Sequence, residues 1–403
     1  MTYYFTSITA NYFAKARVLA STLKAHNLGA KFAIVLSDAL PDFVDPKQEL
    51  ADEILFTSQM DIWGNQDSFF FKHNLTELCT AVKAGVARYI LEKYSADSVV
   101  YLDQDIAVFD SLADLEAMFH EHSILLTPHQ TEPEEYDFFI RRNEILFLKR
   151  GTYNFGFFGV KNDSEGLRFL DWWNRRLMDY CIDDNYEILP ELEKGGALGL
   201  FTDQKWGDLI PCYFDRVGII KEPGYNVCTW NLTHRHFAPA PGNKYTVNGE
   251  PLYFFHFSGF DSGGHINELH NIVDYYPANK DVEILSRWYR QMLKKAGQSV
   301  FEKITYSKTC YDNGVTIRDF ERKLFHIRTD IHSIPEFSNP YHVTDGICFY
   351  SWVRQEYPKW FIQARKNDQL STPLYSKAVD CILPKNSIRR ARVRCLYQKL
   401  IRR

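Results

Sequence analysis

The stretch that decides the fold comprises residues 99–109, which have the sequence VVYLDQDIAVF. Apolar and β-branched residues on both sides of the acidic pair predict a strand inside a sheet that is covered on both faces. Asp103 and Asp105 end this strand, and charged groups are rarely buried unless they are paired or bind a metal ion. Because they are two residues apart, both carboxylates would lie on one side of the chain and could reach one divalent cation.

The N-terminal segments predict a parallel α/β sheet. Residues 3–8, 32–36 and 54–56 each have the composition of a short buried strand. Between the first two, apolar residues from Tyr12 to Leu23 recur at helical spacing. A strand, a helix and a second strand form a βαβ unit, in which ligands bind at the carboxyl ends of the strands. The segment has no Gly-x-Gly-x-x-Gly pattern, which disfavours an ordinary dinucleotide-binding fold.

Residues 75–94 predict one long helix that leads into the aspartate strand, with Lys83 near its middle. A lysine on a helix is commonly a solvated surface charge. The alternative is that Lys83 points over the edge of the sheet towards a phosphate group. The sequence leaves both interpretations open.

Two later segments carry polar residues that suit a binding site. Residues 152–160 have the composition of a strand but include Asn154 and two glycines, and glycine in a strand marks close approach by a ligand or by another part of the protein. Residues 201–206 predict the start of a helix. Thr202 would either cap that helix, or the segment would project Asp203 and Gln204 into a pocket.

A final strand, residues 253–259, contains His256 and ends in a turn of small residues. A single histidine on an apolar strand is more often a core residue than a metal ligand, but its place at a strand end keeps the second interpretation open. From about residue 265 the strand pattern stops, and a helix is predicted over residues 282–294. We expect three regions: a catalytic domain over 1–265, a helical region over 266–380 and a basic tail over 381–403.

The overall composition narrows the class of protein. The chain has 403 residues, a net charge of −4 and eight cysteines without any Cys-x-x-Cys pair. The charge gives no support to nucleic-acid binding, and the scattered cysteines are typical of reduced, cytosolic proteins. No secretion signal or membrane-spanning stretch is predicted. Residues 385–403 combine one apolar helical face with many arginines, which suits either a helix on an anionic membrane surface or a solvated tail.

Taken in order, these segments resemble the metal-dependent glycosyltransferases of the GT-A fold, in particular glycosyltransferase family 8 and related bacterial enzymes of surface-polysaccharide and lipopolysaccharide synthesis. The resemblance covers roughly residues 3–260. It is carried by the opening strand with its turn, the helix around Lys83, Asp103-Gln104-Asp105, Asn154-Phe155-Gly156, Asp203-Gln204 and His256-Phe257-Ser258-Gly259. It implies an α/β fold with a mostly parallel sheet, flanked by helices, and a mainly helical C-terminal appendage.

The resemblance also implies a function and a role for each residue. The reaction would be metal-dependent transfer of a sugar, with retention of configuration, from a nucleotide-diphosphate sugar (a UDP-sugar) to a glycan or lipid-linked glycan. Asp103, Asp105 and His256 would hold Mn²⁺ or Mg²⁺, Asp203 and Gln204 would be catalytic residues beside the donor sugar, and the donor would contact Ser7, Thr9, Tyr12, Lys83, Gln104 and Asn154. We expect a cytoplasmic protein, peripheral at the inner face of the cell membrane.

One departure and two alternatives accompany this interpretation. The family continues from its His-Phe-x-Gly into Lys-Pro-Trp, whose lysine binds the diphosphate, whereas this chain continues with Phe260-Asp261-Ser262. The missing charge would come from Lys83, Lys205 or Arg235. The alternative functions are a sugar-phosphate nucleotidyltransferase, which normally needs a glycine-rich basic loop after its first strand, and a non-catalytic carbohydrate-binding protein.

Overall fold

The structure is a computed structural model that describes residues 1–183 and 198–361. The chain divides into two compact units, Met1–Tyr341 and His342–Arg403. The described part of the second unit contains helix α14 (Phe349–Glu356). The predicted basic tail lies outside the described residues, and the predicted end of the catalytic domain near residue 265 stays a prediction.

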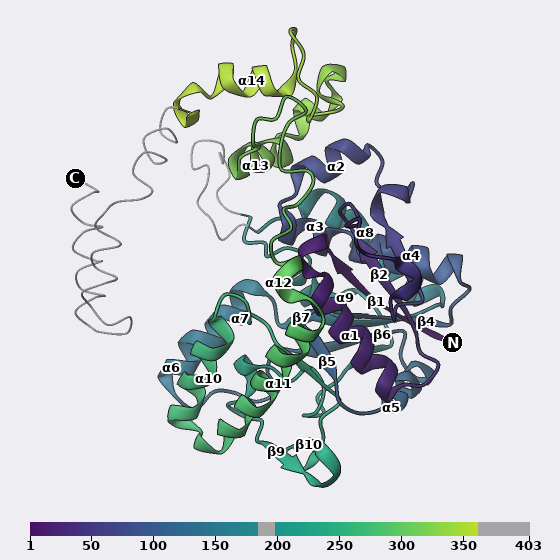
Figure 1. The fold of residues 1–403 in the computed structure, drawn as a ribbon, viewed down its shortest axis with the longest axis vertical. Coiled ribbons are helices and arrows are strands. Elements are labelled where there is room, and N and C mark those ends of the chain that lie inside the picture. The colour runs from purple at the N-terminus through teal and green to yellow at the C-terminus, as the bar shows by residue number, and fades with distance from the viewer. Residues whose placement is uncertain (184–197, 362–403) are drawn as a thin grey trace, which may run out of the picture. The chain divides into compact units, whose positions relative to one another are not determined.

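A seven-stranded sheet forms the centre of the first unit (Figure 1). In spatial order its strands are β3 (Glu53–Phe56), β2 (Lys31–Leu36), β1 (Thr2–Ile8), β4 (Ser98–Leu102), β7 (Tyr153–Lys161), β6 (Ile124–Pro128) and β8 (Val217–Ile219). Strand β7 is antiparallel to both of its neighbours, and the other neighbouring strands are parallel. The predicted fold class, a mostly parallel sheet flanked by helices with a helical C-terminal region, is confirmed.

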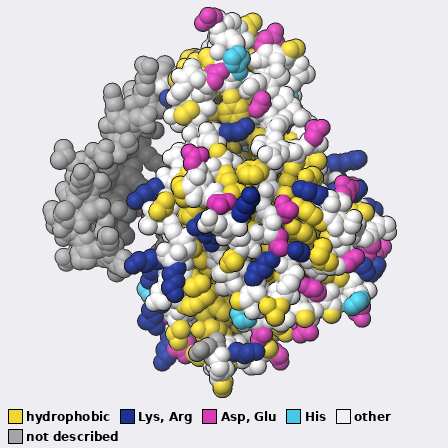
Figure 2. Space-filling view, turned by 45° about the vertical axis from the view of Figure 1, so that its right-hand side comes forward, with side chains coloured by type: hydrophobic (Ala, Val, Ile, Leu, Met, Phe, Trp, Pro, Cys, Tyr) yellow, Lys and Arg dark blue, Asp and Glu magenta, His cyan; other side chains and the backbone are white. Residues whose placement is uncertain are grey.

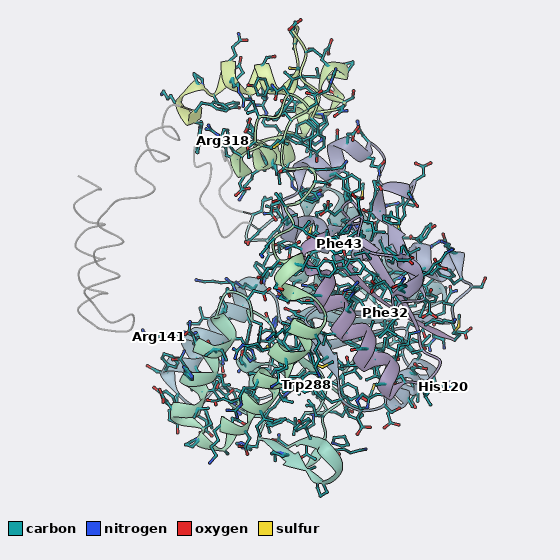
Figure 3. All side chains as sticks on the ribbon, viewed as in Figure 1. Phe32, Phe43, His120, Arg141, Trp288 and Arg318 are labelled. Carbon is teal, nitrogen blue, oxygen red and sulfur yellow. The ribbon has the colours of Figure 1, made fainter. Side chains whose placement is uncertain are left out.

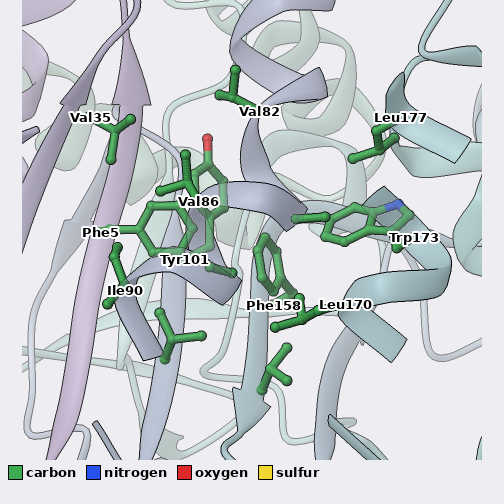
Figure 4. Close-up of a cluster of buried hydrophobic side chains, with 14 of the residues drawn as sticks. Phe5, Val35, Val82, Val86, Ile90, Tyr101, Phe158, Leu170, Trp173 and Leu177 are labelled. Atoms are coloured by element: carbon green, nitrogen blue, oxygen red, sulfur yellow. The ribbon is translucent and has the colours of Figure 1, made fainter. Parts of the chain in front are cut away.

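Alternate residues of the central strands face opposite sides of the sheet, as the period of two in a strand requires. On one side, Phe5 of β1 and Tyr101 of β4 pack edge to face, and Phe158 of β7 stacks on Tyr101. Helices α4 (Lys83–Lys93) and α8 (Ser164–Tyr180) cover this side, which Figure 4 shows in close-up. This layer buries Tyr101, the penultimate residue of β4.

The opposite side of the sheet is equally apolar. Tyr4 of β1 and Val100 of β4 are fully buried there. Helices α1 (Phe13–His26) and α5 (Ala113–Ala117) cover it. Because both sides are covered, polar groups reach solvent only at the strand ends, and the functional site is expected at such an edge.

A second layer extends the first unit beyond the main sheet. Strand β5 (Ile106–Val108) pairs antiparallel with β12 (Phe254–His256), and this ribbon packs against α10 (Gly264–Tyr275) and α11 (Val282–Lys295). Trp288, labelled on α11 in Figure 3, contacts Phe109 just after β5, with 5.1 Å between ring centroids. The ribbon therefore ties the end of β4 to a segment far along the chain.

The remaining helices and strands surround these two layers. They are α2 (Gln66–Lys72), α3 (Leu75–Ala81), α6 (Asp137–Phe139), α7 (Ile145–Arg150), α9 (Ile210–Tyr213), β9 (Phe237–Ala240), β10 (Lys244–Val247), β11 (Glu250–Pro251), α12 (Gln298–Phe301) and α13 (Asp319–Ile327).

The prediction of a single helix over residues 75–94 is wrong in one respect, because this segment forms two helices, α3 and α4. At Val82 the backbone N–H is shared between the carbonyls of Leu78 and Thr80, so the regular ladder is interrupted there. Lys83 is consequently the first residue of α4 and not its middle. This position puts its side chain at the end of the helix that lies nearest the functional edge of the sheet.

The surface agrees with the nearly balanced charge of the sequence. Figure 2 shows Lys and Arg side chains interspersed with Asp and Glu side chains over the visible face. Among the described residues, no helix has the length and apolar character needed to cross a membrane. The six described cysteines are all free thiols: Cys79, Cys181, Cys212, Cys228, Cys310 and Cys348.

Candidate functional site

The acidic pair lies in a turn between two strands of different sheets. Strand β4 ends at Leu102 and β5 begins at Ile106, so the predicted strand 99–109 is two strands joined by the acidic turn. The backbone N–H of Asp103 donates to the carbonyl oxygen of Gly156 at 2.8 Å, which attaches the turn to β7. Both carboxylates therefore lie at the carboxyl end of the central strand, as predicted.

His256 meets both carboxylates. The antiparallel pairing of β12 with β5 sets His256 opposite Ile106, directly after the acidic turn. Its Nε2 lies 3.1 Å from Oδ1 of Asp105 and 3.7 Å from Oδ2 of Asp103. One ligand atom of each residue lies within 4.8 Å of the others, a spacing that can hold a metal ion. His256 is buried and pairs with Asp105, an arrangement that fits both a core histidine with a partner and a metal ligand.

The charges in this cluster are strongly coupled. Burial raises the pKa of Asp105, but His256 and Lys15 outweigh burial and hold that pKa well below its usual range. Burial lowers the pKa of His256, but Asp105 and Asp103 outweigh it and raise that pKa. Without a metal ion, the positive charge beside the two carboxylates comes from the imidazolium of His256. A bound divalent cation would supply that charge instead. Two carboxylates and one imidazole form a ligand set that fits Mn²⁺ or Mg²⁺ better than a metal that prefers sulfur.

Lys83 is buried beside the cluster, so it is not a solvated surface charge. Its side chain is 3% exposed, and Nζ lies 2.9 Å from Oδ2 of Asp203 and 3.6 Å from Oδ1 of Asp103. It also donates a hydrogen bond to the carbonyl oxygen of Phe155 at 2.9 Å. Burial lowers the pKa of Lys83, but Asp103 and Asp203 outweigh it and raise that pKa, so the ammonium stays charged.

Asp203 and Gln204 belong to the same site, because Lys83 lies between Asp203 and Asp103. They follow Thr202, whose backbone φ of 46° is in the left-handed region and turns the chain sharply. Thr202 donates its hydroxyl to Oδ1 of Asp203 at 3.0 Å and does not cap the following 3₁₀ helix (Gln204–Leu209) through its side chain. Burial raises the pKa of Asp203, although Lys83 opposes this.

The amide of Gln204 is fixed on both sides. Its Oε1 accepts from the backbone N–H of Phe155 at 3.3 Å, and its Nε2 donates to the carbonyl oxygen of Arg150 at 3.0 Å. The side chain thus links β7 to the end of α7. An amide that is held in this way keeps one orientation towards the cavity.

Asn154 and Gly156 bring strand β7 close to the imidazole. The Oδ1 of Asn154 accepts from the backbone N–H of Gly156 at 3.1 Å and from Nδ2 of Asn226 at 3.0 Å. A Cβ atom at Gly156 would lie only 2.5 Å from Cε1 of His256. Close approach by another part of the protein therefore explains this glycine.

Gly156→Ala is expected to lower the free energy of unfolding by about 1–3 kcal/mol and to weaken Mn²⁺ binding, since the added methyl group must displace the His256 ring. Gly159→Ala is the matched control on the same strand, because its Cβ would meet Cζ of Phe119 at 2.8 Å instead. Urea unfolding and Mn²⁺ titration calorimetry measure the two effects. Equal Mn²⁺ affinity of both variants would contradict the role given to Gly156.

These residues line one cavity of about 340 Å³ at the edge of the sheet. Of the predicted site residues, it contains Lys83, Asp103, Gln104, Asp105, Asn154, Asp203, Gln204 and His256. Ser7 lies near the end of β1, and Thr9 and Tyr12 follow this strand, but none of the three is among the residues that line the cavity. Lys205 and Arg235, the other suggested sources of charge, are also outside it: Lys205 pairs with Asp208, and Arg235 donates to the carbonyl oxygen of Tyr225.

Sequence reasoning missed two residues of this region. His129 follows β6 and lines the cavity, where burial lowers its pKa to about 4 and its ring stacks on Phe147. Its position shortly after the apolar run of residues 124–126 was the available signal. Lys15, in the first turn of α1, is buried close enough to Asp105 to influence its charge. No local pattern distinguished Lys15 from a surface lysine.

Comparisons with known proteins find relatives that match about half of this chain. No family model matches the chain. In sequence it is similar to two uncharacterized proteins of Bacillus subtilis (strain 168). YfnF is 26% identical over 228 residues, which are 54% of this chain and 67% of YfnF. YfnD is 25% identical over 185 residues, 46% of this chain, and the match spans about half of YfnD, 54% of its length.

The solved structures to which the chain is similar include glycosyltransferases. One is the galactosyltransferase LgtC in complex with donor and acceptor sugar analogs. It is 16% identical, the match covers 73% of this chain and 96% of LgtC, and the TM-score is 0.41. At these identities and scores, the similarity by itself assigns neither a family nor an activity to the chain.

Proposed function

We propose that this protein transfers a sugar from a nucleotide-diphosphate sugar, a UDP-sugar in the first instance, to a glycan or lipid-linked glycan. The observation that carries the proposal is the meeting of Asp103, Asp105 and His256 at the edge of a cavity that also contains Lys83, Asp203 and Gln204. Breaking a sugar–phosphate bond requires charge stabilisation on the leaving diphosphate, and this ligand set fits a divalent cation, which would supply that stabilisation.

In this proposal, Asp103, Asp105 and His256 hold Mn²⁺ or Mg²⁺, which when bound neutralises charge on the leaving group. Lys83 adds a fixed positive charge beside Asp103 at the same edge. Its burial supports that role, because a charge in a poorly hydrated site acts more strongly than one in water. Gln104 lines the cavity between the two acids and would contact the donor.

Asp203, Gln204 and Asn154 would bind the donor sugar. Asp203 would accept a hydrogen bond from a sugar hydroxyl, and its contact with Lys83 supports an ionised, acceptor form. Gln204 would face the sugar ring on the side opposite the leaving group, and Asn154 would fix the orientation of the ring. With retention of configuration, an oxygen of the departing phosphate would accept the proton of the acceptor hydroxyl. Ser7, Thr9 and Tyr12 would contact the nucleoside beyond the cavity.

The proposal is tested by screening nucleotide-sugars with purified full-length protein. A UDP-sugar with Mn²⁺ should raise the unfolding temperature by several degrees, because a ligand that binds only the folded state stabilises it. The same mixture should release UDP, slowly to water and faster with a glycan acceptor. Stabilisation without any release of nucleotide would instead identify a non-catalytic carbohydrate-binding protein. Release of pyrophosphate from a nucleoside triphosphate and a sugar phosphate would identify a nucleotidyltransferase.

A further inference from the structure

Lys15 is a buried cation with an exposed partner. Its side chain is 4% exposed, and Nζ lies 2.6 Å from Oδ2 of Asp261, whose side chain is 45% exposed. A lysine ammonium that has lost its water needs a compensating negative charge. Asp261 supplies that charge but would regain full hydration if it moved away, whereas Lys15 would not. The ion pair is therefore asymmetric: its anion can be replaced by another anion from solvent.

The pair lies next to the metal-ligating cluster. The backbone N–H of Phe257 donates to the carbonyl oxygen of Asp105 at 2.8 Å, so the turn that carries Asp261 begins directly beside this carboxylate. Burial lowers the pKa of Lys15, but Asp105 and Asp261 outweigh it and raise that pKa, so the ammonium is charged and within electrostatic reach of Asp105. Nζ also lies 5.1 Å from the ring centroid of Tyr12.

Of the other cations considered for this edge, Lys83 adds its charge beside Asp103, and Lys205 and Arg235 lie outside the cavity. Lys83 lies between two carboxylates, Lys205 pairs with Asp208, and Arg235 donates to a backbone carbonyl. A nucleoside diphosphate carries more negative charge than one divalent cation removes, and two of the cation's ligands are themselves anionic. A further positive charge on the side of Asp105 would complete the neutralisation.

We propose that Lys15 binds the diphosphate of the nucleotide donor, and that Asp261 occupies the place of this diphosphate until the donor displaces it. This inference rests on the proposed function. It gives Lys15, at the start of α1, a direct contact with the donor, and it gives Asp261 the role of a competing internal anion.

The turn that carries Asp261 can release the carboxylate without losing its own structure. Its backbone bends at Gly259 and Gly263, whose φ values of 69° and 75° lie in the left-handed region. The turn is closed by bonds of its own: the backbone N–H of His265 donates to the carbonyl oxygen of Gly259, and Ser262 donates its hydroxyl to the same oxygen. Among these bonds, none involves the side chain of Asp261.

The test is titration calorimetry of the full-length protein with UDP and, separately, with pyrophosphate, both in the presence of Mn²⁺. Lys15→Met should weaken both affinities roughly tenfold to hundredfold, the usual effect of removing one charged hydrogen-bond donor. Asp261→Asn should tighten both about threefold to tenfold, because the competing anion is gone. The Asp261 change should have no effect in the Lys15→Met background. Lys24→Met is the matched control on the same helix, because Lys24 pairs with Asp52 at the surface.

The outcomes separate this inference from the proposed function. A wild-type protein that binds neither UDP nor any other nucleoside diphosphate with Mn²⁺ overturns both. Wild-type binding that is unchanged in a folded Lys15→Met variant overturns only the role of Lys15. If Lys15→Met does not fold, Asp261→Asn decides: an unchanged or weaker affinity for pyrophosphate overturns the competition, and a tighter one supports it.

Discussion

Replacing Asp103 by alanine is expected to reduce sugar transfer by about three orders of magnitude and to remove most Mn²⁺-dependent binding of the donor. The reason is geometric, because Asp103 contributes one of the three ligand atoms that lie within 4.8 Å of each other. The fold should remain intact, since the Asp103 side chain is 25% exposed and its anchoring bond to β7 uses the backbone. A coupled assay of UDP release measures the transfer.

Asp110→Ala is the matched control for this variant. Asp103 lies before β5 and Asp110 lies after it. Asp110, however, pairs with Lys244 at the surface. Its loss should leave both transfer and Mn²⁺ binding within about twofold of the wild type, because surface pairs contribute little. Transfer by Asp103→Ala at the level of the control would remove the acidic turn from the mechanism.

Lys83→Met is expected to have the second largest effect, on stability as well as on activity. The substitution leaves Asp203 buried without its cation, and removal of one partner from a buried ion pair costs about 3–5 kcal/mol of unfolding free energy. Transfer should fall by about two orders of magnitude, because the fixed charge beside the leaving group is lost as well. Urea unfolding and UDP release measure the two effects separately.

A double variant separates the structural role of Lys83 from its role at the site. Lys83→Met with Asp203→Asn removes both charges, so the unfolding free energy should recover by at least half of the loss in the single variant. Transfer should not recover, since both proposed functions are absent. Recovery of transfer together with stability would mean that Lys83 acts only as the counter-ion of Asp203.

The acidic turn illustrates what local patterns can predict. Strand β4 is apolar on both faces, so its period and its termination at Asp103 follow from the order of residues alone. The position of these carboxylates at the edge of a mostly parallel sheet then follows from general rules of α/β folds. Asn154, Asp203 and Gln204 were candidates from the composition of their own segments, the resemblance to family motifs gave them roles, and all of them line the same cavity.

The lysines illustrate where such patterns fail. Lys15 and Lys83 both lie on helices, where a lysine ordinarily faces solvent. The resemblance singled out Lys83 but left its burial open, and nothing within a few residues distinguishes Lys15 from Lys24. The burial of Lys15 and Lys83 depends on Asp261 and Asp203, which lie more than a hundred residues away along the chain. The break between α3 and α4, which sets the direction of Lys83, was equally invisible, since a shared hydrogen bond at Val82 leaves no trace in apolar periodicity.

Residue order alone settles the α/β class of this chain and the end of β4 at two aspartates, because both depend on the alternation of apolar and polar side chains along short segments. The convergence of His256, Lys83 and Lys15 on those aspartates depends on the pairing of β12 with β5 and on the packing of α1 and α4 on opposite sides of the sheet. Burial then decides which of these charges are held apart from water, and burial is a property of the folded chain that no single segment carries.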